Sequence, residues 1–139
     1  MPVLLIGSLL NASSVASFAN HLKNEKNMNI TVIPCGEVWN DLYENEDSLR
    51  PSIEDYLGAG AILSELEGTK SPEAEVCIGA FLQSKHKLKE LIWECGSGRE
   101  LRMKGFEDDV RHCSQLNHFK VVPILQNNCF VNGLEIEKG

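Results

Sequence analysis

The sequence lacks the features that mark membrane-embedded, secreted and disulfide-bonded proteins. No apolar run approaches the roughly 20 residues that a membrane-spanning helix needs. Residues 1–7 carry neither a basic leader nor a small-residue cleavage site, so we expect a buried strand there rather than a secretory signal. Five cysteines are present, but an odd number without a Cys-x-x-Cys pair argues against a disulfide framework and a zinc site. We therefore expect reduced thiols and a cytoplasmic protein.

Positive charge is also scarce. Lys and Arg total 13 against 20 Asp and Glu, which gives a formal net charge of −7 at pH 7. Nucleic-acid binding needs clustered Lys and Arg, and the only dense basic group, residues 85–89, has the spacing of a solvated helix face. We expect neither a nucleic-acid nor a membrane partner. A small anionic substrate stays compatible with this charge if a local Arg, backbone N–H groups or a metal ion binds it.

Alternating strand and helix patterns predict an α/β fold. Residues 3–7 form a continuous apolar run, which is typical of a strand buried on both faces. A helix is predicted from Asn11 or Ser13 to Asn24, with apolar residues along one stripe. Residues 30–34 then form a β-branched strand. Strand, helix and strand in this order predict a βαβ unit with parallel strands.

The remainder is mostly helical in pattern. Helices are predicted over about 52–66, 72–85, 88–95, 97–105 and 107–116. Residues 121–125 and 129–131 predict a hairpin around the Asn127-Asn128 turn. We expect one domain over residues 1–139, a three-layer α/β/α fold with a small mixed, largely parallel sheet. Because four short strands make a thin sheet, another polypeptide or a second copy of this chain would complete it.

The turn after the first predicted strand is a candidate anion site. In open α/β sheets, ligands bind at the carboxyl ends of strands, where helix N-termini present free N–H groups. Ser8 and Asn11 lie in this turn and would bind a phosphate or sulfonate. The alternative is that Asn11 only caps the following helix.

Three carboxylates follow the second predicted strand. Glu37 comes at its carboxyl end, and Glu54 and Asp55 lie in the first turn of the next helix. They would hold a hard cation such as Mg²⁺, or one of them would act as general acid or base. The alternative is that Glu54 and Asp55 only complement the helix dipole, with Ser52 and Asp55 forming a capping box.

Two glycine-containing segments complete the candidates. Within residues 95–100, Ser97 and Arg99 lie at a helix start where Arg99 would clamp a phosphate. The alternative is a helix–helix turn with Ser97 as cap and Arg99 in solvent. The small residues 58–61, Gly-Ala-Gly-Ala, predict close packing of helices rather than a nucleotide site. No Gly-x-Ser-x-Gly motif indicates an α/β hydrolase.

Taken together, these segments resemble a known family. The most specific part is Arg-Pro-Ser-Ile-Glu-Asp at 50–55 leading to Gly-Ala-Gly-Ala at 58–61. The likeness extends over residues 7–12, 15–16, 32–39, 48–63, 71–74, 97–101, 105–106, 108–110 and 121–123. The sequence resembles the 2-phosphosulfolactate phosphatases, the Mg²⁺-dependent enzymes of coenzyme M biosynthesis.

The resemblance covers only the C-terminal half of that family. The Asp, Arg-Ala-Ser-Thr and Thr-Asn-Gly segments of the family's N-terminal half are absent here. The resemblance implies hydrolysis of a phosphate monoester on a sulfonated lactate, in a site that the N-terminal half completes. It implies catalytic or metal-binding carboxylates at Glu37, Glu54 and Asp55, and substrate-binding groups at Ser8, Asn11, Ser97 and Arg99. The alternative is a non-catalytic binding or assembly module that retains the fold.

Overall fold

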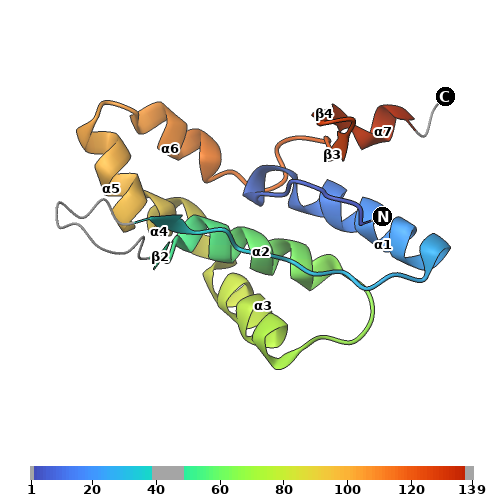
Figure 1. Ribbon diagram of the computed structural model, residues 1–139. Coiled ribbons are helices and arrows are strands. Elements are labelled where there is room, and N and C mark those ends of the chain that lie inside the picture. The colour runs from blue at the N-terminus through green and yellow to red at the C-terminus, as the bar shows by residue number, and fades with distance from the viewer. Residues whose placement is uncertain (1, 39–48, 137–139) are drawn as a thin grey trace.

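The computed structural model describes residues 2–38 and 49–136 (Figure 1). Helices dominate this part of the chain, and its strands are short. In chain order the elements are η1 (Leu9–Asn11), α1 (Ala12–Lys26), β1 (Glu37–Val38), β2 (Leu49–Arg50), α2 (Ile53–Glu65), α3 (Pro72–Ser84), η2 (Lys85–Lys87), α4 (Leu88–Glu94), α5 (Gly96–Met103), α6 (Glu107–Cys113), β3 (Pro123–Gln126), β4 (Cys129–Asn132) and α7 (Gly133–Ile136). The mixed α/β class predicted from the sequence is confirmed.

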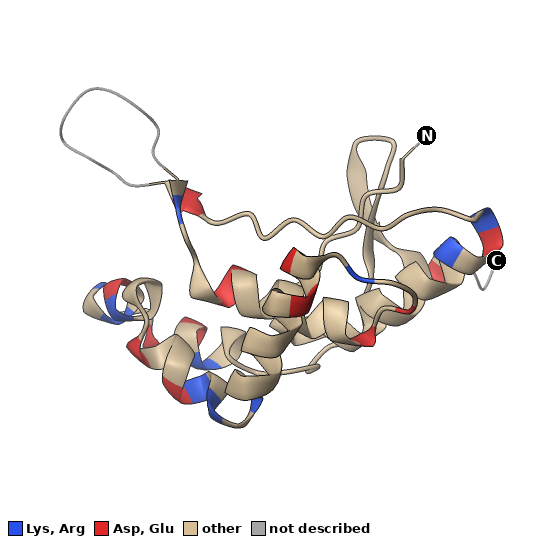
Figure 2. Ribbon diagram, turned by 90° about the horizontal axis from the view of Figure 1, so that it is seen from below, with Lys and Arg blue, Asp and Glu red and all other residues tan. Residues whose placement is uncertain are grey.

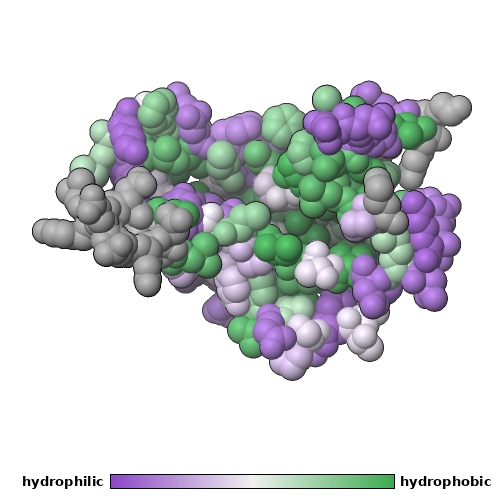
Figure 3. All heavy atoms as spheres, in the orientation of Figure 1, coloured by the Kyte–Doolittle hydropathy of each residue, from purple (hydrophilic) through white to green (hydrophobic). Residues whose placement is uncertain are grey.

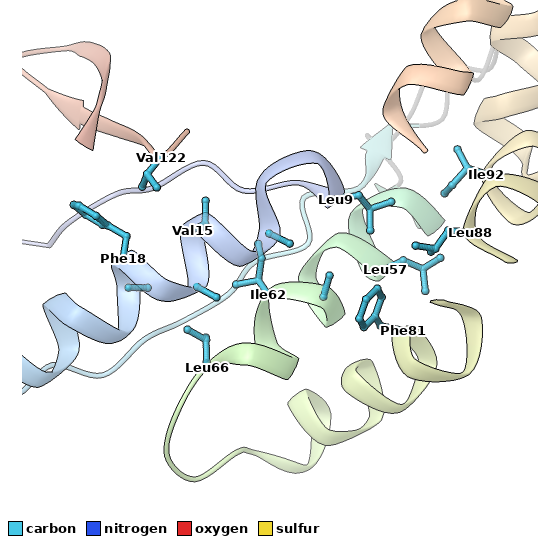
Figure 4. Packing of buried hydrophobic residues seen from close by; sticks show 14 of the residues in the cluster. Leu9, Val15, Phe18, Leu57, Ile62, Leu66, Phe81, Leu88, Ile92 and Val122 are labelled. Carbon is cyan, nitrogen blue, oxygen red and sulfur yellow. The ribbon is translucent and has the colours of Figure 1, made fainter. Parts of the chain in front are cut away.

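The apolar core runs along α2 and joins the two ends of the molecule. Figure 4 shows Val15 of α1 beside Ile62 of α2, with Phe18 and Val122 toward one end. Toward the other end, side chains of η1, α2, α3 and α4 meet; they are Leu9, Leu57, Phe81, Leu88 and Ile92. Each large side chain removed from water stabilises the fold by roughly 1.5–3 kcal/mol. The core therefore holds α1, α2 and α3 together as one packed unit.

Small residues on α2 allow the close approach of α3, as the sequence predicted for residues 58–61. A Cβ placed on Gly60 would lie 2.5 Å from the carbonyl oxygen of Cys77 and 2.7 Å from Cβ of Phe81. Both neighbours belong to α3, which begins with Pro72 at its first position and is capped by the Ser71 hydroxyl. The glycine is thus required because no side-chain atom fits between the two helix backbones.

The C-terminal hairpin also forms where the turn chemistry predicted it. β3 and β4 pair antiparallel, with Ile124 opposite Val131. Asn127 and Asn128 join them with φ of 49° and 63°, the left-handed pair that a two-residue hairpin turn needs. Asparagine tolerates this conformation better than other non-glycine residues, which explains the two adjacent asparagines.

The predicted parallel sheet is not found in the described residues, where both sheets are two-stranded and antiparallel. Residues 3–7 are extended, but within the described part of the chain their only ladder contact is an antiparallel bridge from Leu5 to Ile124. Residues 30–34 are extended without being a strand. Figure 1 shows both segments running in the same direction along α1 and α2, as in a βαβ unit. The apolar pattern gave the extended backbone correctly, but a strand forms only when a neighbour accepts its hydrogen bonds.

The predicted three layers are likewise not complete in the described residues. Helices α1 and α2 cover one face of the two extended segments. On the other face, Leu4, Ile6 and Ile33 are 53%, 47% and 74% exposed. Within the described part of the chain no helix has the length and apolarity to cross a membrane. All five cysteines are free thiols among the described residues.

Substitution of one glycine in α2 and one in α3 distinguishes the effect of helix packing from that of helix propensity. We predict that Gly60→Ala lowers the free energy of unfolding by about 1–3 kcal/mol, because its methyl group meets the α3 backbone. Gly79→Ala, on the exposed side of α3 with nothing within 4 Å, should raise it by about 0.5–1 kcal/mol through helix propensity. Urea unfolding of both variants measures the difference. Equal effects of the two substitutions would contradict the packing role of Gly60.

Candidate functional site

A cavity of about 590 Å³ separates the two extended segments. Its walls are residues 3–10 and 28–35, and its floor is formed by side chains of α1 and α2, including Val15 and Ile62. Figure 3, in the orientation of Figure 1, shows hydrophobic side chains over the middle of this face and hydrophilic ones around it. Polar groups line the end where both segments stop; they belong to Ser8, Cys35, Glu54, Asp55 and Cys113. The candidate site is this polar end.

The turn at Ser8 is held in place by a buried asparagine. Asn11 is 5% exposed, and its side-chain oxygen accepts a hydrogen bond from the Ser8 N–H at 2.8 Å. Its amide nitrogen donates to the carbonyl oxygens of Ile6, at 3.3 Å, and Val121, at 3.1 Å. Both amide protons are therefore engaged, and Asn11 positions the turn rather than presenting a donor to the cavity. The exposed Ser8 hydroxyl accepts from the Leu10 N–H at 3.2 Å and remains at the cavity wall.

Asp55 joins the end of the second predicted strand to α2. Its Oδ2 accepts a hydrogen bond from the Gly36 N–H at 2.8 Å. Gly36 has φ of 71°, a conformation that favours glycine, so the turn that presents this N–H depends on that residue. The Ser52 side chain makes no cap bond, and the capping box predicted for Ser52 and Asp55 is wrong. The reason is that Asp55 reaches a tertiary partner 19 residues earlier instead of its own helix terminus.

The Arg50 side chain contacts three polar residues from two other elements, namely Glu37, Ser97 and Glu100. Its side chain is 12% exposed and contacts Glu100 at 2.7 Å and Glu37 at 3.1 Å. It also donates to the Ser97 hydroxyl at 3.2 Å. The hydrogen bond with Glu100, followed by the charges of Glu100, Glu37 and Glu54, raises the pKa of Arg50. In Figure 2, a basic and an acidic stretch of ribbon lie side by side at the β1–β2 pair, where Glu37 is opposite Arg50.

Arg50 is a functional candidate that sequence reasoning missed. A signal for it existed, because Arg50 is the only Lys or Arg between Lys26 and Lys70, in a stretch rich in acids. A lone cation there must neutralise several carboxylates. The guanidinium links β1 to α5 through its contacts with Glu37 and Glu100.

Of the remaining predicted residues, Glu54 lies at the cavity and Arg99 does not. Glu54 lines the cavity, and its Oε2 lies 3.9 Å from Sγ of Cys95. Burial, and to a smaller extent the Glu54 charge, raises the pKa of the Cys95 thiol, which keeps it neutral near pH 7. Arg99 is 63% exposed, pairs with Glu94 at 3.4 Å and is not among the residues that line the cavity.

The described carboxylates do not form a complete metal site. Within residues 2–38 and 49–136, no three Asp, Glu, His or Cys side chains gather closely enough to hold a metal ion. Glu37 is engaged by Arg50, whereas Glu54 and Asp55 face the cavity. Two carboxylates at a cavity wall can accept a proton or contribute to a cation site. Binding of a multiply charged anion would need further positive groups beside them.

Comparison with known proteins places these features in a family. The family model described as 2-phosphosulpholactate phosphatase matches residues 1–128. A protein named probable 2-phosphosulfolactate phosphatase from Carboxydothermus hydrogenoformans is 31% identical over 122 residues, 86% of this chain and 45% of that protein. The 2-phosphosulfolactate phosphatase of Methanothermobacter thermautotrophicus is 29% identical over 123 residues, 88% of this chain and 48% of that protein.

The extent of these matches settles the assignment. The chain spans about half the length of the curated relatives it matches, and the matched region includes the cavity walls and Arg50, Glu54 and Asp55. Because the family model accounts for nearly the whole sequence, this chain belongs to the 2-phosphosulfolactate phosphatase family.

Proposed function

We propose that this chain supplies one part of a phosphatase site that hydrolyses a phosphate monoester of the 2-phosphosulfolactate type to sulfolactate and phosphate. The observation that carries the proposal is the family match combined with a cavity whose polar end holds Glu54 and Asp55. The relatives named for this activity are about twice as long as the matched region. The remaining part of the site therefore belongs to the part of the family's sequence that has no counterpart here.

Glu54 and Asp55 are the proposed catalytic carboxylates. In hydrolysis, water attacks phosphorus, the phosphorus–oxygen ester bond breaks, and the departing alcohol oxygen receives a proton. A carboxylate that faces the cavity can accept the proton from water or deliver one to the leaving oxygen. Asp55 is also fixed in direction by the Gly36 N–H, so its second oxygen is the one available for this task.

The other predicted residues receive supporting roles in the proposal. Ser8, at the cavity wall, would contact the phosphate or sulfonate, and Asn11 would position the Ser8 turn. Ser97 and Glu37 would be held through Arg50. Arg99 would contribute only by giving up its contact with Glu94, so we assign it the smallest part.

Charge explains why this chain would not be sufficient alone. A phosphosulfolactate carries a phosphate, a sulfonate and a carboxylate, whereas this chain has a net charge of −7. The guanidinium of Arg50 already contacts two carboxylates. We propose that Mg²⁺ and positive groups from the remainder of the family's site supply the missing charge. Since the described residues do not assemble a metal site, Glu54 and Asp55 would be only part of its ligand set.

The alternative function is a non-catalytic binding or assembly module in the cytoplasm. It is favoured by the incomplete metal site of the described residues and by the engagement of Arg50. Five free thiols agree with a reducing compartment for either function. The two functions differ in a single measurable property, the release of phosphate.

We predict that the chain alone releases no phosphate from 2-phosphosulfolactate, with or without Mg²⁺. A chimera that joins it to the unmatched part of the Carboxydothermus hydrogenoformans relative should release phosphate and require Mg²⁺. A colourimetric phosphate assay measures both, with the relative itself as positive control. Release by the chain alone would show that its site is complete, and no release by a folded chimera would favour the binding module.

We also predict that Glu54→Gln and Asp55→Asn each lower the kcat of the active chimera by about 100- to 10,000-fold, because each removes a proton acceptor. The amide oxygen introduced by Asp55→Asn keeps an acceptor for the Gly36 N–H, so the fold should persist. Glu75→Gln is the matched control, since Glu75 is an exposed acid in the first turn of α3. Unchanged kcat in both test variants would refute the assigned roles.

A further inference from the structure

The two extended segments that wall the cavity have unfilled backbone edges facing each other. Leu4 and Ile6 direct their backbone groups to β3: the Leu125 N–H donates to the Leu4 carbonyl, and the Ile6 N–H donates to Pro123, both at 3.0 Å. Successive residues of an extended chain direct these groups to opposite edges, so those of Val3 and Leu5 face the cavity. In the described part of the chain, no hydrogen bond reaches the backbone of Val3 or Leu5.

The second wall also lacks ladder hydrogen bonds, and its Ile33 carbonyl accepts only a local contact from the Cys35 thiol at 3.7 Å among the described residues. No backbone–backbone hydrogen bond involves residues 29–34 among those described, although the segment is rich in β-branched residues. Figure 1 shows it running in the same direction as residues 3–7. Two neighbouring segments of a βαβ unit ordinarily pair directly or through a strand between them. Here they are held apart by a cavity of about 590 Å³.

The lining of the cavity is mostly uncharged, and its charged residues are Lys23, Glu54 and Asp55. Residues 2–11 and 27–36 contain no charged side chain, and Figure 2 shows both segments without charge along their length. A lipid tail or an apolar small molecule would match this surface but would leave the backbone N–H and C=O groups unpaired, which is costly in an apolar cavity. An extended polypeptide satisfies both requirements. Five residues of strand span about 17 Å, the extent of residues 3–7.

We propose that the cavity between residues 3–7 and 29–34 receives an uncharged β-strand from the part of the family's sequence that this chain does not match. The curated relatives are matched over only 45–48% of their length, so they contain more than half a chain with no counterpart here. In them that half is covalently attached and always adjacent. The choice of this partner rests on the proposed function; the docking geometry rests on the two backbone edges.

The inserted strand would join both walls into one sheet and place the partner at the catalytic end. Ser8, Asp55 and Gly36 lie where the two segments stop, so a loop at the end of the strand would reach the carboxylates. The exposed Leu4, Ile6 and Ile33 would lie under the partner's second layer. The same event would complete both the sheet and the site.

Amide hydrogen exchange tests the docking separately from catalysis. In the chimera with the Carboxydothermus hydrogenoformans segment, the amides of Val3, Leu5 and residues 29–34 should exchange about 100-fold more slowly than in the chain alone. The Ile6 amide, already bonded to Pro123, should change much less. Exchange followed by NMR resolves these positions individually.

A matched pair of charge insertions adds a second measurement. Ile33 and Val76 are both exposed β-branched residues, but only Ile33 lines the cavity. Ile33→Glu should return the exchange of residues 29–34 in the chimera to within about tenfold of the chain alone, whereas Val76→Glu should preserve the protection. Thermal unfolding of the isolated variants confirms that both are folded.

The outcomes separate docking from function. Protection at both walls supports the strand even if no phosphate is released, a result that would count against the proposed function alone. Phosphate release without protection at either wall overturns the strand and leaves the proposed function standing. Protection that arises in the chain alone and increases with its concentration identifies a second copy as the occupant, which also overturns the proposal.

Discussion

The close approach of α2 to its neighbours is the constraint on which the rest of the structure depends. Gly60 brings α2 against the backbone of α3, and Gly58 brings it near the backbone of Ser8 and Leu9. Because α2 carries Glu54 and Asp55 in its first turn, its depth in the molecule determines where these carboxylates lie. A larger residue at Gly60 would move the helix and its acids together. Packing and site geometry are therefore the same property in this chain.

Two long-range contacts convert that packing into a defined site. The Asp55–Gly36 hydrogen bond fixes the end of one extended segment to α2, and the buried Asn11 side chain fixes the end of the other. Arg50 then links β1 to α5 by contacts with Glu37 and Glu100. Each contact joins segments that are distant in sequence. The polar end of the cavity is thus held in position before any ligand binds, which lowers the entropy cost of binding.

Local chemistry made part of this fold predictable from sequence. The two asparagines of the hairpin turn, Pro72 at a helix start and the small residues 58–61 each fix a structure through their own backbone or size. The failure of residues 3–7 and 30–34 to form strands was not predictable, because an apolar run specifies extended backbone but not the neighbour that pairs with it. The Arg50–Glu100 and Asp55–Gly36 contacts were missed for a related reason. Their residues are 50 and 19 positions apart, and no local sequence pattern indicates a contact over such a separation.

The open backbone edges at residues 3–5 and 29–34 also affect the tendency of the protein to aggregate or to be degraded in a cell. Unpaired, uncharged extended segments are the usual starting points of edge-to-edge aggregation. The described part of both segments lacks the lysines, charges and bulges that natural edge strands use against it. Chain made in excess of whatever covers these edges would be directed to chaperones or proteolysis. For a partner of the kind proposed above, the abundance of this chain would follow that of the partner, because uncovered copies are removed.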